Sequence, residues 1–572
     1  MLSHQQFGRT ARSAGWSDLL GVAVLFAVIS GVVVVAREWT GPLRPMADLH
    51  LEAEYLPLYT FLSLSRGVAA YLLSFLFTLA YGGLMARNRQ TERVMIPLLD
   101  VLQSIPVLGF LPGFVLVLVH LFPHRNLGLE LASVLMIFTG QVWNMTFSYY
   151  SSLKSLPPDL IAVSKLVKMS RWQRFLRLNL SFAANGLVWN SMMSMAGGWF
   201  FLSVCEAFVL GEHDFRLPGL GSYVSLAIER GDLHAQFMGV GAMLVMIVGV
   251  DQLLWRPVVA WSRKFTDEPR QEGPESWFWE RLQRSRLWRG GWRILQGAIR
   301  RLPSRGSAIA SVLHRPSELV AWPARRWLTR GLGGLTVVAI AIGAIFYVRL
   351  LVTLTLDEWL DLLSSAGITF LRVLSAVVLA SVWTIPVGVW IGQRPAWARV
   401  LQPVIQMMAS FPAPMIFPIV VGAMSTWGAG LGISSVFLLV LGTQWYVLFN
   451  VMAGSLAIPR ELWEVANMSR FSVFQRWRIL ILPALFPSLL TGWISAMGGA
   501  WNASIVAEYM KYRGQTLTAH GLGAAINRAT EQGNFHVLAA AVGLMALAVV
   551  GFNRLVWRPL SHHAQTRFAM GS

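Results

Sequence analysis

Apolar stretches of membrane-spanning length recur along this chain, and they restrict its fold more than any other feature. A helix of roughly 20 apolar residues crosses a bilayer core of about 30 Å. Such stretches lie near 19–36, 59–85, 102–122, 129–150, 183–207 and 235–255, and again near 332–353, 366–392, 401–423, 431–453, 484–507 and 536–557. The sequence therefore predicts an all-α polytopic membrane protein with about twelve transmembrane helices, and not a soluble enzyme.

The distribution of basic residues predicts the orientation of the chain. Its 572 residues include 47 Lys and Arg against 28 Asp and Glu, a formal charge of +19. With the N-terminus inside, the loops that hold most of this charge fall on the cytoplasmic side, namely 87–89, 154–177, 256–330, 394–399 and 470–478. We therefore expect a multi-pass protein of the bacterial inner membrane with both termini cytoplasmic and no binding to nucleic acid. The single cysteine, Cys205, excludes a disulfide framework within one chain.

The two halves of the chain are copies of each other. An offset of 302 residues pairs Glu206 with Glu508, and an offset of 306 residues pairs Arg66 with Arg372 earlier in each half. Further pairs are Trp143 with Trp445, Pro157 with Pro459, Ser170 with Ser472, Trp199 with Trp501, and Gly219-Leu220-Gly221 with Gly521-Leu522-Gly523. Each copy holds six predicted spans, an even number, so the copies are expected to be parallel repeats. In transporters built from such repeats, the substrate passes between the halves.

The duplication divides the chain into four predicted parts. Residues 1–257 form the first repeat, 331–560 the second repeat, and 561–572 a cytoplasmic tail. The stretch between the repeats, 258–330, is basic and mixes Trp with Arg, which is typical of helices at a membrane surface. Basic residues among aromatic ones could also stack on nucleic acid, but the flanking spans favour a cytoplasmic or interfacial linker in contact with lipid.

A basic loop of helical composition joins the fourth and fifth spans of each repeat. We call 156–182 the first connecting loop and 458–484 the second. Each begins with a proline followed by an acidic residue, which favours a helix start because the first turn needs no proline N–H and the acid faces the positive end of the helix dipole. Ser and Gln-Arg recur at matching positions, which orientation alone does not explain. We expect a short helix at the cytoplasmic membrane face.

The second connecting loop resembles the EAA loop of binding-protein-dependent ABC importer permeases. The resemblance covers 464–487, and 499–508 is similar to the fifth span of the nitrate, sulfonate, taurine and bicarbonate branch. The resemblance covers both repeats and leaves the linker and the first span of each half outside, and the duplicated form resembles fused permeases with two permease domains. In that family the loop is a coupling helix that docks on an ATPase subunit. The resemblance therefore implies ATPase-coupling roles for Glu464, Ala466, Ser472, Gln475 and Arg476, and for Ser170, Gln173 and Arg174 in the first loop.

The first connecting loop departs further from the family pattern than the second. Lys168 and Arg470 stand where the family usually has glycine. The first loop also has Ala162, Ser181 and Asn185 at the positions of Glu464, Pro483 and Pro487. We therefore expect the first loop to be the weaker dock.

Carboxylates inside predicted spans are costly, and by default they indicate function. Glu206 and Glu508 lie late in the fifth spans. They could pair with a neighbouring span to fix packing, or line a translocation pathway, where an unneutralised carboxylate would repel an anion. Trp199, Trp501 and Asn502 lie about two turns earlier. All five are candidate pathway residues, with core packing as the alternative for the tryptophans.

The sequence contains no phosphate-binding loop of the form G-x-x-x-x-G-K-S/T and no catalytic constellation. We therefore expect a transport component and not an enzyme, with no cofactor in this chain and with ATP bound by two partner ATPase subunits. A periplasmic or lipid-anchored substrate-binding protein is a further expected partner. The branch resemblance implies a small anion such as nitrate, a sulfonate or bicarbonate. The alternatives are a twelve-span secondary transporter driven by an ion gradient, and a membrane enzyme or scaffold.

Overall fold

The computed structural model describes residues 30–265 and 338–567, except for 32, 105, 211–212, 339–340, 429 and 513. By their contacts the residues fall into two units. The larger unit comprises Thr40–Ser155, Gly186–Gly249 and Val337–Ser572, and the smaller unit comprises Met1–Trp39, Leu156–Asn185 and Val250–Thr336. Most of the first predicted span, the predicted linker beyond residue 265 and the end of the tail lie outside the described residues.

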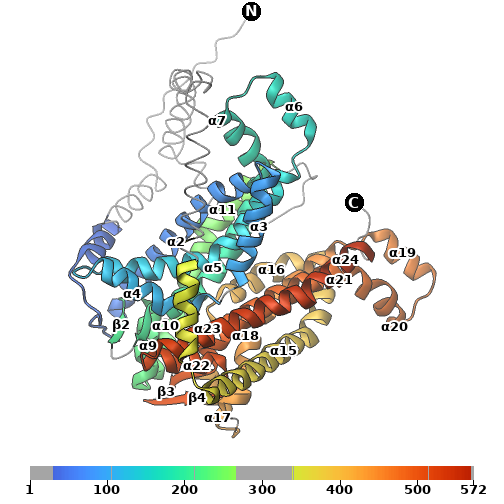
Figure 1. Ribbon diagram of the computed structural model, residues 1–572. Coiled ribbons are helices and arrows are strands. Elements are labelled where there is room, and N and C mark those ends of the chain that lie inside the picture. Colours follow the sequence, from blue (N-terminus) through green and yellow to red (C-terminus); the bar gives the residue numbers. More distant parts are fainter. Residues whose placement is uncertain are drawn as a thin grey trace, which may run out of the picture. The chain divides into compact units, whose positions relative to one another are not determined.

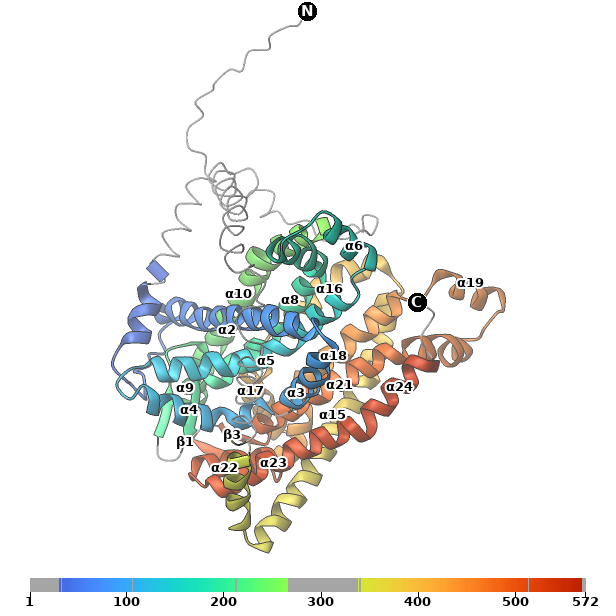
Figure 2. The same ribbon diagram turned by 45° about the horizontal axis from the view of Figure 1, so that its top comes forward.

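Long apolar helices form most of the larger unit (Figure 1). Helix α2 packs against α5, and α18 packs against both α15 and α21, as Figure 2 also shows. The helices of the first repeat are α2 (Leu56–Met85), α5 (Leu127–Lys154), α8 (Leu180–Cys205) and α10 (Leu233–Val250), and their equivalents in the second are α15 (Leu356–Gly392), α18 (Leu431–Leu456), α21 (Leu482–Ala507) and α23 (Phe535–Phe552).

Small residues let these helices approach closely. On α2 the buried residues Ala70, Ser74, Thr78 and Gly82 recur every four positions and so share one face. A Cβ atom on Gly82 would lie 2.9 Å from the ring of Tyr149 on α5. The equivalent residues of α15 are again small and buried, namely Ala376, Ala380, Thr384 and Gly388. Close packing of small residues is a main source of helix association in membranes.

The third predicted span of each repeat is not one continuous helix, so the prediction is wrong at this point. In both repeats the helix ends just before a proline, Pro106 or Pro412, and a short 3-10 turn leads into a second helix. Proline disfavours a helical conformation in the residue before it, so the helices of the two repeats end at the same place. The segments are α3 (Arg89–Ser104), η2 (Val107–Phe110), α4 (Leu111–Leu121), α16 (Pro395–Ser410), η6 (Ala413–Met415) and α17 (Phe417–Ser425).

Two short β-hairpins follow the ends of α8 and α21, where the sequence predicts no strands. In each hairpin the two strands pair antiparallel, and a helix begins a few residues later. The elements are β1 (Ala207–Leu210), β2 (His213–Arg216), α9 (Leu220–Arg230), β3 (Tyr509–Tyr512), β4 (Gln515–Thr518) and α22 (Leu522–Glu531). Strands of four residues are too short to give a clear alternation of apolar and polar side chains.

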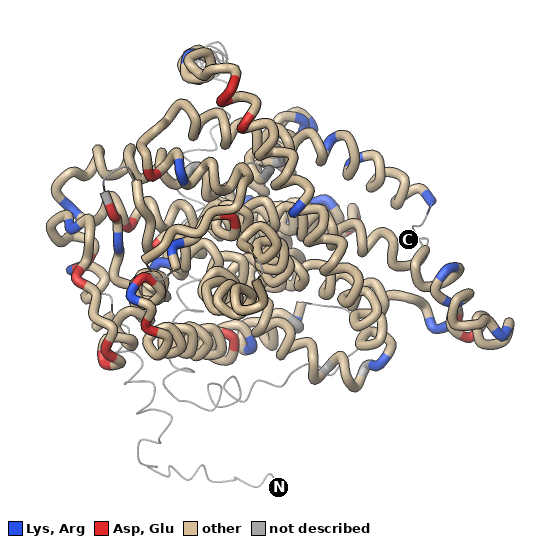
Figure 3. The backbone as a smooth tube through the Cα atoms, turned by 90° about the horizontal axis from the view of Figure 1, so that it is seen from below, with Lys and Arg blue, Asp and Glu red and all other residues tan. Residues whose placement is uncertain are grey.

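Six helices among the described residues are long and apolar enough to cross a membrane. They are Ala53–Met85, Leu233–Ser262, Leu356–Gly392, Leu431–Leu456, Val473–Ala507 and Phe535–Ala564. Helices α5 and α8 have 28 and 26 residues but are not in this set. Figure 3 shows that long stretches of helix carry no Lys, Arg, Asp or Glu. The architecture is therefore the expected all-α membrane fold, with two small hairpins added.

Both connecting loops fold as two helices joined by a turn, and the first helix begins one residue after the expected proline. The first loop, in the smaller unit, contains α6 (Pro158–Leu166), α7 (Arg171–Arg174) and the π-helical turn η3 (Phe175–Asn179). The second loop, in the larger unit, contains α19 (Arg460–Met468), α20 (Val473–Gln475) and the π-helical turn η7 (Arg476–Ile481). Further described segments are η1 (Ala53–Tyr55), η4 (Asp251–Trp255), α11 (Arg256–Ser262), η5 (Arg263–Phe265), an apolar helix over Ala341–Val352, η8 (Asn553–Trp557) and α24 (Arg558–Arg567).

Candidate functional site

A buried ion-pair network joins four helices of the first repeat. Arg66 on α2 has no exposed surface, and its Nη1 atom lies 2.7 Å from Oε1 of Glu206, at the end of α8. Its Nε atom lies 2.6 Å from Oε2 of Glu130 on α5. Glu206 also accepts hydrogen bonds from Ser63 Oγ at 2.7 Å and from the N–H of Gly221 on α9 at 2.7 Å. The buried charges are thus paired and hydrogen-bonded, as burial requires.

The second repeat has the same network with one carboxylate fewer. Nη1 of Arg372 lies 2.9 Å from Oε1 of Glu508, which also accepts hydrogen bonds from Thr369 Oγ1 at 2.9 Å and from the N–H of Gly523 at 2.8 Å. The residue equivalent to Glu130 is Gly432. The Arg372 side chain is 11% exposed, whereas the Arg66 side chain is fully buried.

The recurring Gly-Leu-Gly motif makes room for these carboxylates. A Cβ atom on Gly219 would overlap the carboxylate of Glu206, and one on Gly521 would overlap that of Glu508. A Cβ atom on Gly221 would also lie 2.7 Å from the carbonyl oxygen of Ser203. Glycine is needed here because of the close approach of side chain to backbone.

These contacts give Glu206 and Glu508 a packing role, and neither residue lines the two cavities described below. Their place on a translocation pathway stays a prediction. Their partners were not among the residues predicted from the sequence, although the duplication pairs Arg66 with Arg372. A basic residue that recurs inside an apolar span needs a buried counter-charge, and this signal could have found the network.

Residues of both repeats line a cavity of about 490 Å³, which we call the central cavity. Equivalent residues of the two repeats line it, such as Trp143 and Trp445, or Gly197 and Gly499. Among the described residues that line it, none is Asp, Glu, Lys, Arg or His. Its polar groups are amides, hydroxyls and indoles, so the wall is polar and uncharged.

Two of the predicted pathway residues, Trp501 and Asn502, line the central cavity. Asn502 Oδ1 accepts a hydrogen bond of 2.8 Å from the backbone N–H of Val107. A side chain of the second repeat therefore binds the turn η2 of the first repeat. Trp199 is absent from the lining residues of this cavity. It is buried against Gly67 on α2, where a Cβ atom would lie 2.7 Å from the indole ring.

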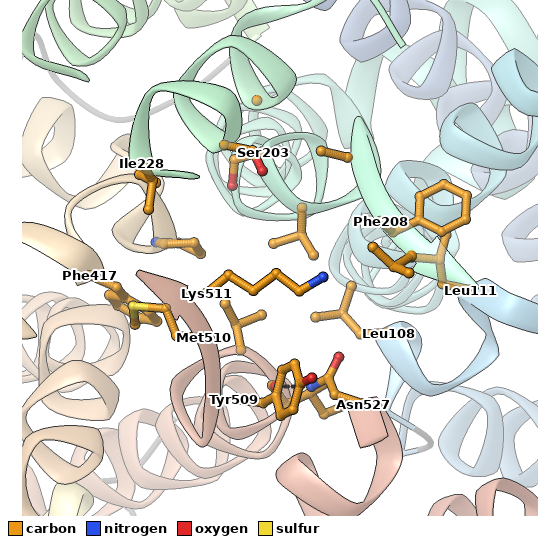
Figure 4. Close-up of a pocket in the computed structure, with 18 of the residues that line it drawn as sticks. Leu108, Leu111, Ser203, Phe208, Ile228, Phe417, Tyr509, Met510, Lys511 and Asn527 are labelled. Atoms are coloured by element: carbon orange, nitrogen blue, oxygen red, sulfur yellow. Dashed lines mark hydrogen bonds between the residues drawn. The ribbon is translucent and has the colours of Figure 1, made fainter. Parts of the chain in front are cut away.

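A second cavity of about 250 Å³ is lined by residues of both hairpins, and we call it the hairpin cavity. Leu108 of η2 and Met415 of η6 line the hairpin cavity, whereas Val107 and Ala413 of the same turns line the central cavity. The turns η2 and η6, which interrupt the third predicted span of each repeat, therefore lie between the two cavities. In Figure 4 the side chain of Lys511 extends across the hairpin cavity toward Leu108.

The charged groups of the hairpin cavity are paired with one another. Arg216 Nη2 lies 2.7 Å from Asp214 Oδ2 and 2.6 Å from Glu229 Oε2. Lys511 Nζ lies 3.0 Å from Oε1 of Glu531, the equivalent of Glu229 in the second repeat. Tyr509 donates its hydroxyl to Glu531, and burial together with that carboxylate raises the pKa of Tyr509. Both cations among the described residues that line the hairpin cavity, Arg216 and Lys511, thus have a carboxylate partner.

The second connecting loop is built around a capping box. The N–H of Gln475 donates to Ser472 Oγ at 3.3 Å, and the N–H of Ser472 donates to Gln475 Oε1 at 2.8 Å. Arg470 in the preceding turn has a φ of 50°, the left-handed conformation that favours glycine. Ala466 is buried in a small core with Leu480. These residues therefore shape the loop itself.

Two further predicted coupling residues, Glu464 and Arg476, are not part of the capping box. Glu464 is exposed on α19, where a partner could reach it. Arg476 is partly buried, and its Nε atom donates to the carbonyl oxygen of Phe471 at 3.2 Å. The coupling roles of all these residues stay predictions.

The first connecting loop has the same construction despite its sequence departures. Ser170 and Gln173 form an equivalent capping box, and Lys168 has a φ of 50°. Ser164 replaces Ala466 and is buried, and its hydroxyl is satisfied there because it donates to the carbonyl oxygen of Ile161 at 2.7 Å. The Nε atom of Arg174 is buried without an acceptor among the described residues.

Each connecting loop exposes apolar side chains at the same two positions. Met468 on α19 is 84% exposed, and its equivalent Leu166 on α6 is 81% exposed. Val465 and Val163, one turn earlier, are also exposed. Apolar residues exposed at equivalent positions of two repeats are typical of a contact surface.

The sequence profile of the family described as "Binding-protein-dependent transport system inner membrane component" matches this chain twice, over residues 74–254 and 384–556. The two matches together cover more than half of the chain. They confirm the predicted duplication, and each match contains one connecting loop.

Several permeases are similar to the chain at low identity. A protein of Bacillus subtilis named "putative aliphatic sulfonates transport permease" is 27% identical over 40% of this chain and 80% of its own length. A nitrate import permease of Leptolyngbya laminosa is 27% identical over 32% of this chain and 63% of its own length. A taurine transport permease of Escherichia coli is 27% identical over 32% of this chain and 62% of its own length. The chain thus spans less than two thirds of the latter two relatives.

Proposed function

Because the chain belongs to the family of inner-membrane components of binding-protein-dependent transport systems, we propose that it forms the complete membrane pathway of an ATP-driven importer. In this proposal the two repeats are the two halves of the permease, fused in one chain. ATP is hydrolysed by two separate ATPase subunits, and a periplasmic or lipid-anchored binding protein delivers the substrate. The protein lies in the bacterial inner membrane with both termini in the cytoplasm.

The observation that carries the proposal is the repetition of the connecting loops. Both have the same order of helices, the same capping box and a left-handed basic residue at the same place. Both present an exposed apolar residue, Leu166 or Met468, at the end of the first helix. A transport ATPase moves a permease only if its nucleotide states contact the two permease conformations differently. A rigid helix pair at the membrane face can transmit such a difference, and two equivalent pairs favour two ATPase subunits.

A small anion is the proposed substrate class. The names of the relatives, which concern sulfonates, nitrate and taurine, support this proposal. The uncharged wall of the central cavity is consistent with it, because a carboxylate there would repel an anion.

The central cavity also bears on the main alternative, a secondary transporter driven by an ion gradient. Such transporters use ionisable side chains near the middle of the membrane to carry protons or to coordinate ions. Among the described residues that line the central cavity, none is ionisable at neutral pH. This absence favours coupling to ATP through the loops.

The proposal can be tested with substitutions on the exposed faces of the loops. Met468→Glu and Leu166→Glu place a charge at the two proposed docking positions, and Asn467→Glu adds the same charge at an exposed neighbouring position. We expect each of the first two variants to lose the ATPase copy that docks on its own loop and, with it, ATP-dependent uptake in proteoliposomes, while Asn467→Glu retains most of both. Uptake that persists without any ATPase, or that is driven by an ion gradient alone, would favour the secondary transporter.

A further inference from the structure

We propose that the central cavity binds an organic anion with an apolar body, held by neutral hydrogen-bond donors. This inference rests on the proposed function and deepens it by naming the substrate class. It assigns the permease a selectivity of its own, in addition to that of any binding protein. The cavity has a volume of about 490 Å³, which is within the roughly 300–1,000 Å³ typical of sites for small organic ligands.

Buried hydrogen-bond donors without partners line the central cavity. The indole Nε1 atoms of Trp143 and Trp501 and the hydroxyl of Ser194 have no hydrogen-bond partner among the described residues. Trp501 is 1% exposed and Ser194 is 2% exposed, so bulk water does not satisfy these groups. A buried donor left without an acceptor is unfavourable. An acceptor that enters the cavity beside these groups would remove that cost.

The chemistry of these donors favours an anion. An indole N–H can donate and cannot accept, and each amide side chain on the wall, such as Gln103 or Asn144, offers two N–H donors. An oxyanion presents only acceptors and therefore matches them. The amides also carry carbonyl oxygens, but the described wall has no carboxylate to neutralise a cation, and the groups left without partners are two indole N–H groups and a hydroxyl. The absence of cationic side chains also keeps binding weak enough for release, which transport requires.

The rest of the wall favours a ligand with an apolar body. Aromatic side chains from both repeats line the cavity, among them Phe201, Phe411, Trp445, Phe449, Phe552 and Trp557. A bare inorganic anion such as nitrate has no apolar group that could be buried against these rings. An alkyl or aryl group attached to an oxyanion can bury apolar surface there while its head accepts hydrogen bonds.

The test measures binding to the purified full chain in lipid nanodiscs, without an ATPase. The probe is radiolabelled butane-1-sulfonate, and the competitors are nitrate and butylammonium. We expect saturable binding of the probe, competition by nitrate that is at least about tenfold weaker than by unlabelled butane-1-sulfonate, and no competition by butylammonium. Equal competition by nitrate would refute the apolar body, and equal competition by butylammonium would refute recognition of the anion.

Two variants and one control test the donors. Trp501→Phe removes the N–H and keeps an aromatic ring, and Ser194→Ala removes a hydroxyl with little change of volume. Loss of a hydrogen bond to a charged ligand should weaken binding about tenfold or more in each. The control is Trp493→Phe on the same helix α21, because the N–H of Trp493 donates to Ser381 Oγ at 2.9 Å and the residue does not line the cavity.

Equal affinities of wild type, Trp501→Phe and Ser194→Ala would overturn the role of the donors. Because the binding measurement needs no ATPase, its failure leaves the docking of ATPases on the loops untouched. Conversely, binding that follows this pattern in a chain that recruits no ATPase would keep the site and contradict the proposed function.

Discussion

Arg66 should contribute more to stability than its equivalent Arg372, because it neutralises two buried carboxylates and Arg372 neutralises one. Leaving a buried charge without its partner costs about 3–5 kcal/mol. Arg66→Met would leave both Glu130 and Glu206 without the guanidinium, whereas Arg372→Met would leave only Glu508. The free energy of unfolding should therefore fall by about 3–5 kcal/mol more for Arg66→Met than for Arg372→Met.

The extra cost should arise at Glu130. Glu206 keeps hydrogen bonds from Ser63 and from the N–H of Gly221 when Arg66 is removed. The side-chain hydrogen bonds of Glu130 come from Nε and Nη2 of Arg66, at 2.6 and 2.7 Å. Replacing Glu130 by glutamine in the Arg66→Met background removes the unpaired charge, so most of the extra loss should be recovered.

The assay is unfolding of the purified chain in mixed detergent and dodecyl sulfate micelles, followed by circular dichroism. The expected order of stability is wild type, then Arg372→Met and the double variant Arg66→Met/Glu130→Gln, then Arg66→Met. Equal losses for the two arginine variants would refute the reasoning. A double variant no more stable than Arg66→Met would show that the unpaired Glu130 is not the cause.

Three further predictions concern the connecting loops. Arg470→Gly should stabilise the turn by up to about 1–2 kcal/mol, because glycine adopts the observed φ of 50° without the cost that arginine bears there. Arg470→Val should destabilise the turn, because a β-branched residue tolerates a positive φ less well than arginine. Amide hydrogen exchange of the loop measures both. Ser472→Ala removes the capping box and should cost about 1 kcal/mol, seen as faster exchange at the N–H of Gln475; unchanged exchange would contradict it. Glu464→Ala should reduce transport-coupled ATPase activity roughly tenfold or more, and far more than Asp159→Ala in the first loop, if the glutamate makes a charge-assisted hydrogen bond to the ATPase. Equal losses would show that the first loop is not the weaker dock.

The internal duplication made much of the fold predictable. A pattern that occurs twice at a fixed offset, as in Glu206 and Glu508, separates required residues from incidental ones without any other sequence. The recurrence of Ser and Gln in both loops has a local cause, since each pair forms a capping box. The break in the third span was also encoded, in the prolines Pro106 and Pro412, but overall apolarity predicted a continuous helix there.

Contacts between distant segments could not be predicted from periodicity. Nothing in the local sequence connects Arg66 with Glu130, because a charge inside an apolar span shows that a partner exists and not where it lies. The hydrogen bond from Val107 to Asn502 has no counterpart in the other repeat, where Phe200 stands in place of Asn502. The duplication therefore gives no signal for it.

The central claim is that one chain supplies both halves of an importer and carries two ATPase subunits. Leu166→Cys and Met468→Cys place a thiol at each proposed dock, and the native Cys205 is fully buried and out of reach of a crosslinker. In the purified complex, a thiol-to-amine crosslinker should attach one ATPase copy to each single variant and two copies to one chain of the double variant, as measured by mass spectrometry. A double variant that never carries more than one ATPase, or a complex with two copies of this chain, would contradict the account.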